Sequence, residues 1–197
     1  MTLPNKLTVG RIALTPVFFI VFSLTVFREQ ILVSGIILLW IIQIVSEVSD
    51  VLDGHIARKH NLVSDMGKIM DPFGDVLSRV TYFVCFTAVG LMPLWALIVI
   101  LWREFCIMFI RMVMAKEGTA LAARKGGKLK AVFYFISGIF GLFILTLQSL
   151  GITGYMAELI LAGKILFSLA ALSSLISFVE YFLLFIKTDT MKQFIKE

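Results

Sequence analysis

Charged residues are scarce in this chain of 197 residues, because Asp, Glu, Lys and Arg together make up only 16% of it. Soluble domains carry about 25%, so the chain has too little polar surface to coat a water-soluble globule. The same scarcity excludes a disordered chain and a coiled coil. Hydrophobic residues make up 59% of the sequence, and its mean hydropathy is +0.98. Most of the chain must therefore face lipid or other apolar helices.

Cysteine and proline are also few. The two cysteines, Cys85 and Cys106, both lie in apolar stretches, which argues against a disulfide framework or a zinc site. Four prolines and 14 glycines exclude a collagen-like or low-complexity chain. No internal repeat or linker divides the sequence, so we expect one domain over residues 1–197. We attribute the net charge of +5 to loops that rest on anionic lipid headgroups, and not to a nucleic-acid partner.

Six stretches are apolar enough to form transmembrane helices, which need about 20 mostly apolar residues each. They cover approximately residues 11–27, 31–51, 70–91, 94–114, 131–150 and 160–186. The first is not a cleavable signal, because Pro16 lies inside it and no small-residue cleavage site follows. The sequence therefore predicts an all-α, polytopic membrane protein with about six transmembrane helices.

Basic residues alternate between the connections of these six stretches. They gather before the first stretch, in the second and fourth connections and in the tail, whereas the opposite side has little besides Arg28. Because Lys and Arg favour the cytoplasmic side, we expect both termini and these two connections in the cytoplasm, in a protein of the inner cell membrane. The basic residues concerned are Lys6, Arg11, Arg58, Lys59, Lys68, Lys116, Arg124, Lys125, Lys128, Lys130, Lys187, Lys192 and Lys196.

Four aspartates flank the second connection, in pairs with helical spacing. Asp50 and Asp53 are three residues apart, and Asp71 and Asp75 are four apart, so each pair projects from one helix face. A charge at the bilayer centre costs roughly 2.5–3.5 kcal/mol, which favours a shared polar cavity over lipid exposure. Carboxylates this close would repel one another unless divalent cations such as Mg²⁺ or Mn²⁺ bind them. Salt bridges between helices are the structural alternative.

Arginines in the fourth stretch suggest a second, cationic site. Arg103 and Arg111 are eight residues apart and so lie on similar faces of a helix. Arginine suits bidentate contact with phosphate, and Arg124 and Lys128 follow on the next connection. For Arg124, Lys125 and Lys130, anchoring on lipid is the more common role, so their part in a phosphate site stays open.

The aspartates belong to a longer motif, Asp50-x-x-Asp53-Gly54-x-x-Ala57-Arg58, eight residues, Gly67-x-x-x-Asp71-x-x-x-Asp75. This motif resembles that of the CDP-alcohol phosphotransferases at all its fixed positions. The resemblance implies a six-helix membrane enzyme, usually dimeric, that moves a phosphatidyl or similar group from a CDP-linked donor to an alcohol and releases CMP. The segments at residues 3–16, 103–111 and 127–130 further resemble the phosphatidylglycerophosphate synthases of that family. That likeness implies CDP-diacylglycerol as donor and glycerol 3-phosphate as acceptor.

The resemblance also implies a role for each motif residue. Asp50, Asp53 and Asp71 would hold one divalent ion, Asp71, Asp75 and Asp50 would hold the other, and Asp75 would be the general base. The CDP-binding residues would be Gly54, Ala57, Arg58, Ser64 and Gly67. The cations for the acceptor phosphate would be Arg103, Arg111, Arg124 and Lys128.

Two alternative functions stay open on the sequence alone. The same donor chemistry could serve another acceptor, namely phosphatidylglycerol, serine or inositol phosphate. A transporter or channel is a different class, because polar residues in a six-helix bundle could line a path. The clustering of charge at one side and the lack of an inverted repeat argue against that class.

Overall fold

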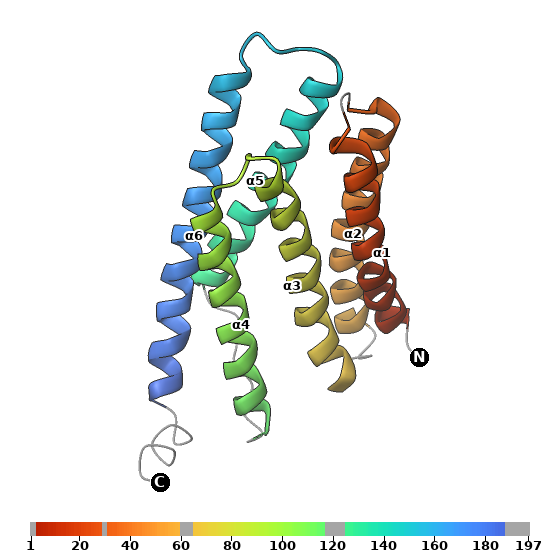
Figure 1. The fold of residues 1–197 in the computed structure, drawn as a ribbon. Coiled ribbons are helices and arrows are strands. Elements are labelled where there is room, and N and C mark those ends of the chain that lie inside the picture. Colours follow the sequence, from red (N-terminus) through yellow and green to blue (C-terminus); the bar gives the residue numbers. More distant parts are fainter. Residues whose placement is uncertain (1–2, 29–30, 60–64, 117–124, 188–197) are drawn as a thin grey trace.

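The computed structural model describes residues 3–28, 31–59, 65–116 and 125–187, and every regular element in those ranges is an α-helix. The helices are α1 (Leu3–Val26), α2 (Val33–Lys59), α3 (Asp65–Ala88), α4 (Leu94–Lys116), α5 (Lys125–Ser149) and α6 (Met156–Ile186). They form one bundle in which successive helices run in opposite directions (Figure 1). The predicted all-α architecture of six helices is confirmed, and four of the six are candidate membrane spans.

Several helices extend beyond their apolar stretches. Helix α1 begins at Leu3, α2 continues to Lys59 and α5 begins at Lys125, each in a region that hydropathy alone assigned to a connection. Helices α1, α2, α5 and α6 contain segments long and apolar enough to cross a membrane. Helices α3 and α4 carry several charges along their length. Some of these charges form ion pairs inside the bundle, among them Asp75 of α3 and Glu104 of α4.

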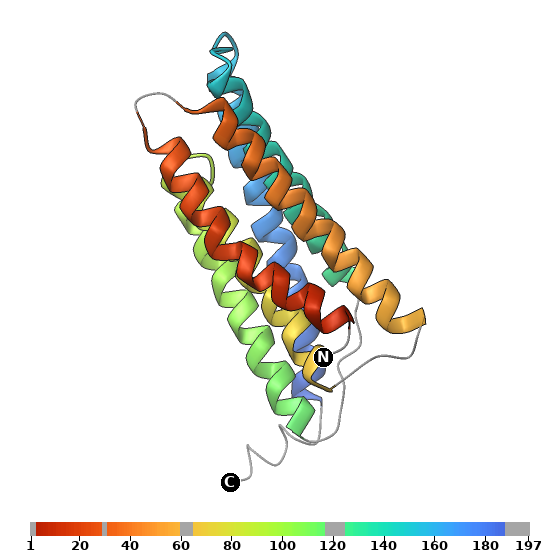
Figure 2. The ribbon, with the colours of Figure 1, turned by 90° about the vertical axis from the view of Figure 1, so that its right-hand side faces the viewer.

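Helices α3 and α5 connect the two sides of the bundle, because α3 packs against α1, α4 and α5, and α5 packs against α2, α3 and α6. Helix α1 packs against α2 and α3, α5 and α4 both pack against α6, and α3 also contacts α4 and α5. Figure 1 shows α1 beside α2 on one flank and α4 beside α6 on the other, with α5 crossing between them. Figure 2 shows the same bundle from the flank of α1 and α2. We call the end of the bundle at which α1, α3 and α5 begin, and at which α2, α4 and α6 end, the charged end.

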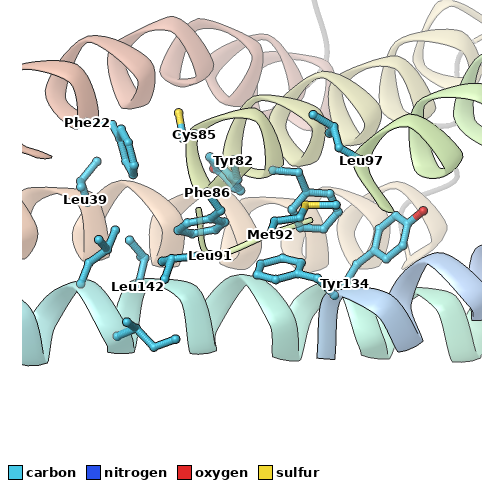
Figure 3. Close-up of a cluster of buried hydrophobic side chains, with 14 of the residues drawn as sticks. Phe22, Leu39, Tyr82, Cys85, Phe86, Leu91, Met92, Leu97, Tyr134 and Leu142 are labelled. Atoms are coloured by element: carbon cyan, nitrogen blue, oxygen red, sulfur yellow. The ribbon is translucent and has the colours of Figure 1, made fainter. Parts of the chain in front are cut away.

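Aromatic side chains fill the interior away from the charged end (Figure 3). The ring of Phe167 on α6 lies 5.5 Å from that of Phe83 and 5.8 Å from that of Phe86, both on α3. Helix α3 ends at Ala88, and Gly90 follows in the turn, where its φ of 75° suits glycine because a side chain would be strained there. The turn lets Leu91 and its neighbour Met92 fold back into the core, where each is at most 2% exposed.

We predict that the charged end faces the cytoplasm, which labelling can check. Lys128 and Arg28 are both exposed and lie at opposite ends of the bundle. In a variant that lacks Cys85 and Cys106, a cysteine at position 128 should react with an impermeant maleimide only from the cytoplasmic side. A cysteine at position 28 should react only from the other side. Labelling of both from the same side would contradict the six-span topology.

Candidate active site

The four motif aspartates lie at the charged end, two on α2 and two on α3. Asp53 is buried, with a side chain 4% exposed, whereas Asp50 and Asp75 are 32% and 33% exposed. The helical spacing inferred from the sequence therefore brings both pairs to one region. The difference in exposure means that this region is closed on the Asp53 side and open on the side of Asp50 and Asp75.

A basic residue of α1 lies among these carboxylates. The side chain of Arg11 is 3% exposed, and its Nη1 donates to Oδ1 of Asp50 and, at 2.6 Å, to Oδ1 of Asp75. Its Nη2 lies 3.8 Å from Oδ2 of Asp53. One guanidinium thus joins three helices through three of the four motif aspartates.

A threonine one helical turn before Arg11 completes the set. The hydroxyl of Thr8 lies 2.8 Å from Oδ1 of Asp71 and 3.1 Å from Oδ2 of Asp53. Its single proton can serve only one of these two oxygens at a time. Helix α1 approaches α3 closely at position 74, where a Cβ in place of the glycine hydrogen would lie 3.2 Å from the side chain of Ile12.

The chemistry of these side chains fits hard divalent cations. The donor atoms are carboxylate oxygens, which Mg²⁺ and Mn²⁺ prefer. The four carboxylates outweigh the charge of Arg11 together with that of Arg79 on α3, which also interacts with Asp75 and Asp50. In the arrangement seen here the carboxylates turn toward Arg11 and Thr8. Within the described ranges, no group of three or more His, Cys, Asp or Glu side chains is gathered closely enough to hold a metal ion.

The other motif positions are distributed along the same two helices. Gly54 is half-buried on α2, and Gly67 is buried on α3. Ala57 and Arg58 lie in the last turn of α2, and the structure does not describe their side chains. Ser64 lies outside the described residues. The predicted CDP-binding role of these five residues therefore stays a prediction.

A second group of charges lines a cavity of about 230 Å³ between α3, α4, α5 and α6. Of the predicted acceptor cations, Arg103, Arg111 and Lys128 all line it, and Arg124 lies outside the described residues. Nε of Arg103 and Nε of Arg111 are buried without a hydrogen-bond partner among the described side chains. Two of the arginines that line the cavity therefore have an unused N–H donor.

Glu104 is the counter-ion of this cavity. Its carboxylate is buried and accepts hydrogen bonds from Nη1 of Arg103 at 3.0 Å and from Nζ of Lys130 at 2.6 Å. The hydroxyl of Tyr134 lies 3.0 Å from the same carboxylate and 2.9 Å from Oγ of Ser174. Arg103 also donates to Ser177 on α6 at 2.9 Å, so the network ties α4 to both α5 and α6.

Lys130 lies in a different environment from the one that its sequence position suggests. Lipid anchoring is the common role for a lysine at a cytoplasmic helix end, yet the residue is 8% exposed and lines the cavity. The sequence likewise indicated no site role for Arg11 or Thr8, whereas Glu104 was expected to face a polar cavity with the arginines of its helix, as it does. One signal for α1 was available, because Thr8, Arg11 and Thr15 recur at helical spacing in an apolar stretch.

The two charged groups share a wall. The α3 side of the cavity is formed by Pro72 and Val76, which directly follow Asp71 and Asp75 in the chain. The aspartates and the cavity therefore lie on adjoining faces of α3. Carboxylates that can collect cations and a cation-lined cavity that can hold an anion are arranged as neighbouring sites.

Comparison with known proteins agrees with the motif. The family model described as CDP-alcohol phosphatidyltransferase matches residues 1–185. A Rickettsia bellii protein is 31% identical over 180 residues, which cover 91% of this chain and 93% of that protein. A Bacillus subtilis protein is 39% identical over 65% of this chain and 69% of its own length. A Treponema pallidum protein is 35% identical over 68% of this chain and 62% of its own length. All three are named CDP-diacylglycerol–glycerol-3-phosphate 3-phosphatidyltransferase.

We predict that Glu104→Ala destabilises the protein by about 3–5 kcal/mol, because it leaves Arg103 and Lys130 buried without their counter-ion. The free energy of unfolding in detergent measures the effect. Glu158→Ala is the matched control, since Glu158 is exposed and its loss should cost no more than about 1 kcal/mol. Equal losses in the two variants would show that the network around Glu104 adds no stability.

Proposed function

This chain belongs to the CDP-alcohol phosphatidyltransferase family, and on that basis we propose that it transfers the phosphatidyl group of CDP-diacylglycerol to glycerol 3-phosphate. The products are phosphatidylglycerophosphate and CMP. The observation that carries this choice of acceptor is the cation-lined cavity beside the motif aspartates. The printed names of the relatives point to the same reaction.

The aspartates are proposed to form the donor site. Asp50, Asp53, Asp71 and Asp75 would hold two divalent ions, Mg²⁺ or Mn²⁺, which would neutralise the pyrophosphate of the donor and stabilise charge on departing CMP. Gly54 and Gly67 leave room for the nucleotide near the backbone, and Arg58 would contact a phosphate. Ala57 and Ser64 would complete the nucleotide contacts.

Asp75 is proposed to act as the general base. It lies on the open side of the group, one third exposed, and the following residue, Val76, lines the cavity. Its carboxylate would take the proton of the acceptor hydroxyl as that oxygen bonds to the phosphorus that carries diacylglycerol. The bond from this phosphorus to the bridging oxygen of the pyrophosphate breaks, and CMP leaves with the bonding electrons.

The cavity is proposed to bind the phosphate of the acceptor. A phosphate dianion needs cations of its own, because ions at the aspartates are already occupied by the donor. Arg103 and Arg111 each have a buried Nε without a partner among the described residues, and Lys128 reaches the same cavity from α5. Arg124 would add a further cation from the preceding connection. Serine and phosphatidylglycerol lack a terminal phosphate monoester, so they would leave these donors unused.

The location follows from the same reasoning. The protein is a multi-pass membrane protein, and we propose that it lies in the inner cell membrane with the charged end in the cytoplasm, where glycerol 3-phosphate arrives from water. We retain the homodimer implied by the family resemblance as part of this proposal.

A panel of acceptors tests the reaction. CMP release from CDP-diacylglycerol should be fastest with glycerol 3-phosphate and much slower with serine, phosphatidylglycerol or inositol phosphate. The Asp71→Asn variant, which lacks one donor-site carboxylate, should release essentially no CMP with any acceptor while remaining folded. Preference for another acceptor would overturn the choice of glycerol 3-phosphate, and full activity of Asp71→Asn would overturn the metal-assisted mechanism.

Arg111 tests the cavity. We predict that Arg111→Ala lowers kcat/KM for glycerol 3-phosphate about tenfold to a hundredfold, because a charge-assisted hydrogen bond contributes about 1.5–3 kcal/mol. The KM for CDP-diacylglycerol should change little. Lysine at this position should restore activity only in part, since it lacks the planar fork of arginine. Lys164→Ala, an exposed cation remote from the charged end, is the control. An unchanged acceptor KM in folded Arg111→Ala would exclude the residue from the phosphate site.

A further inference from the structure

Arg11 makes contacts that bear on how cations reach the aspartates. Its Nη1 donates to Asp50 and Asp75, and its Nη2 lies 3.8 Å from Asp53. These are carboxylates that the proposed function assigns to divalent ions. Arg11 and the metal ions would therefore compete for the same carboxylate oxygens. A lone pair that accepts a hydrogen bond from the guanidinium cannot bind a metal ion at the same time.

The surroundings of Arg11 indicate what would happen without it. Asp50, Asp53 and Asp75 approach one guanidinium, and without a cation between them they would repel one another or take up protons. The guanidinium cannot lose its own proton, so it remains a permanent positive charge. Among the described residues, no three acidic side chains are gathered as metal ligands while Arg11 holds this position.

We infer that Arg11 is a built-in counter-ion that holds the aspartates together in the metal-free protein and that divalent cations bind by displacing its guanidinium from Asp50 and Asp75. This inference rests on the proposed function, because that proposal assigns the aspartates to metal ions. It adds a residue of α1 that competes with the ions and thereby sets the affinity of the site.

The geometry offers a route for the exchange. Asp50 and Asp75 are each about one third exposed, so ions can approach them from outside while Arg11 lies behind, 3% exposed. Thr8 lies within hydrogen-bond distance of Asp53 and Asp71 and can donate to one of these carboxylates while Arg11 is displaced. Nε and Nη2 of Arg11 have no hydrogen-bond partner among the described residues, so its fit among the carboxylates is incomplete.

Removal of the guanidinium should have two effects, one on metal affinity and one on stability. Without the competing guanidinium, Arg11→Gln should bind Mn²⁺ about tenfold more tightly or better, because one charge-assisted hydrogen bond corresponds to at least that factor. In chelator the same variant should melt at a lower temperature than the wild type, because its carboxylates have lost their counter-ion. Mn²⁺ should therefore raise its melting temperature by more than it raises that of the wild type.

The experiment uses the full chain in detergent with Mn²⁺ alone and no substrate. Free Mn²⁺ is followed by its electron paramagnetic resonance signal for the wild type, Arg11→Gln and Arg11→Lys. Lysine keeps the positive charge but lacks the two-pronged guanidinium, so we expect the Mn²⁺ affinity of Arg11→Lys to lie between those of the wild type and Arg11→Gln. If Arg11→Gln does not fold, Arg11→Lys provides the test. Arg28→Gln is the matched control, since Arg28 follows the other end of α1 and is exposed; its Mn²⁺ affinity should equal that of the wild type.

The outcomes separate the inference from the proposed function. Equal or weaker Mn²⁺ binding by folded Arg11→Gln, in a protein whose wild type releases CMP with glycerol 3-phosphate, overturns the counter-ion role alone. Tighter binding by Arg11→Gln in a protein that does not transfer to glycerol 3-phosphate supports the counter-ion role and overturns the proposed acceptor. Failure of the wild type, Arg11→Gln and Arg11→Lys to bind Mn²⁺ overturns both the metal assignment and the inference.

Discussion

The contact of Arg11 with the motif aspartates fixes the relative positions of three helices. Apolar faces in a membrane can slide or rotate against one another at little cost, because lipid is as apolar as the partner helix. A buried guanidinium that contacts Asp50 and Asp75 at once allows only one register of α1 against α2 and α3. The aspartates can be brought together on α2 and α3 because α1 supplies a cation to hold them. The site and the fold at this end of the bundle therefore depend on the same contact.

The charged end is divided between two groups of opposite sign, and α3 contributes to both. Its aspartates face α1 and α2, whereas Pro72 and Val76 form part of the cation-lined cavity with α4, α5 and α6. Two anionic substrates could not approach each other without separate neutralisation. Helices α1 to α3 are placed to neutralise one of them, and helices α4 to α6 to neutralise the other. Because α3 packs against α1 in one half and against α4 and α5 in the other, the two halves lie within reach of one reaction.

Hydropathy and spacing predicted much of this arrangement. The six helices and the grouping of Asp50 with Asp53 and of Asp71 with Asp75 depend on local sequence, so they could be inferred without a structure. The buried partners could not, because whether a basic residue near a helix end faces lipid or the bundle depends on how that helix is rotated. Lys130 shows this clearly: its position in the chain is typical of an anchor, but Glu104 on another helix holds it inside. Arg11 is similar, since its role requires the close approach of α1 to α3 seen at Gly74.

A carboxylate in a cavity that is proposed to bind an anion requires a physical explanation. Arg103 and Lys130 are buried, and two unpaired cations there would cost more than the membrane helices could offset. Glu104 neutralises part of this charge and fixes both side chains through short hydrogen bonds. It does so without removing the positive character of the cavity, because Arg111 and Lys128 line it as well and Arg103 keeps an unused Nε. Glu104 thus resembles Arg11 in its physical role. Each side chain has the charge opposite to that of its neighbours and stabilises a group of like charges. Neither neutralises its group completely, so the remaining charge can bind a substrate or an ion.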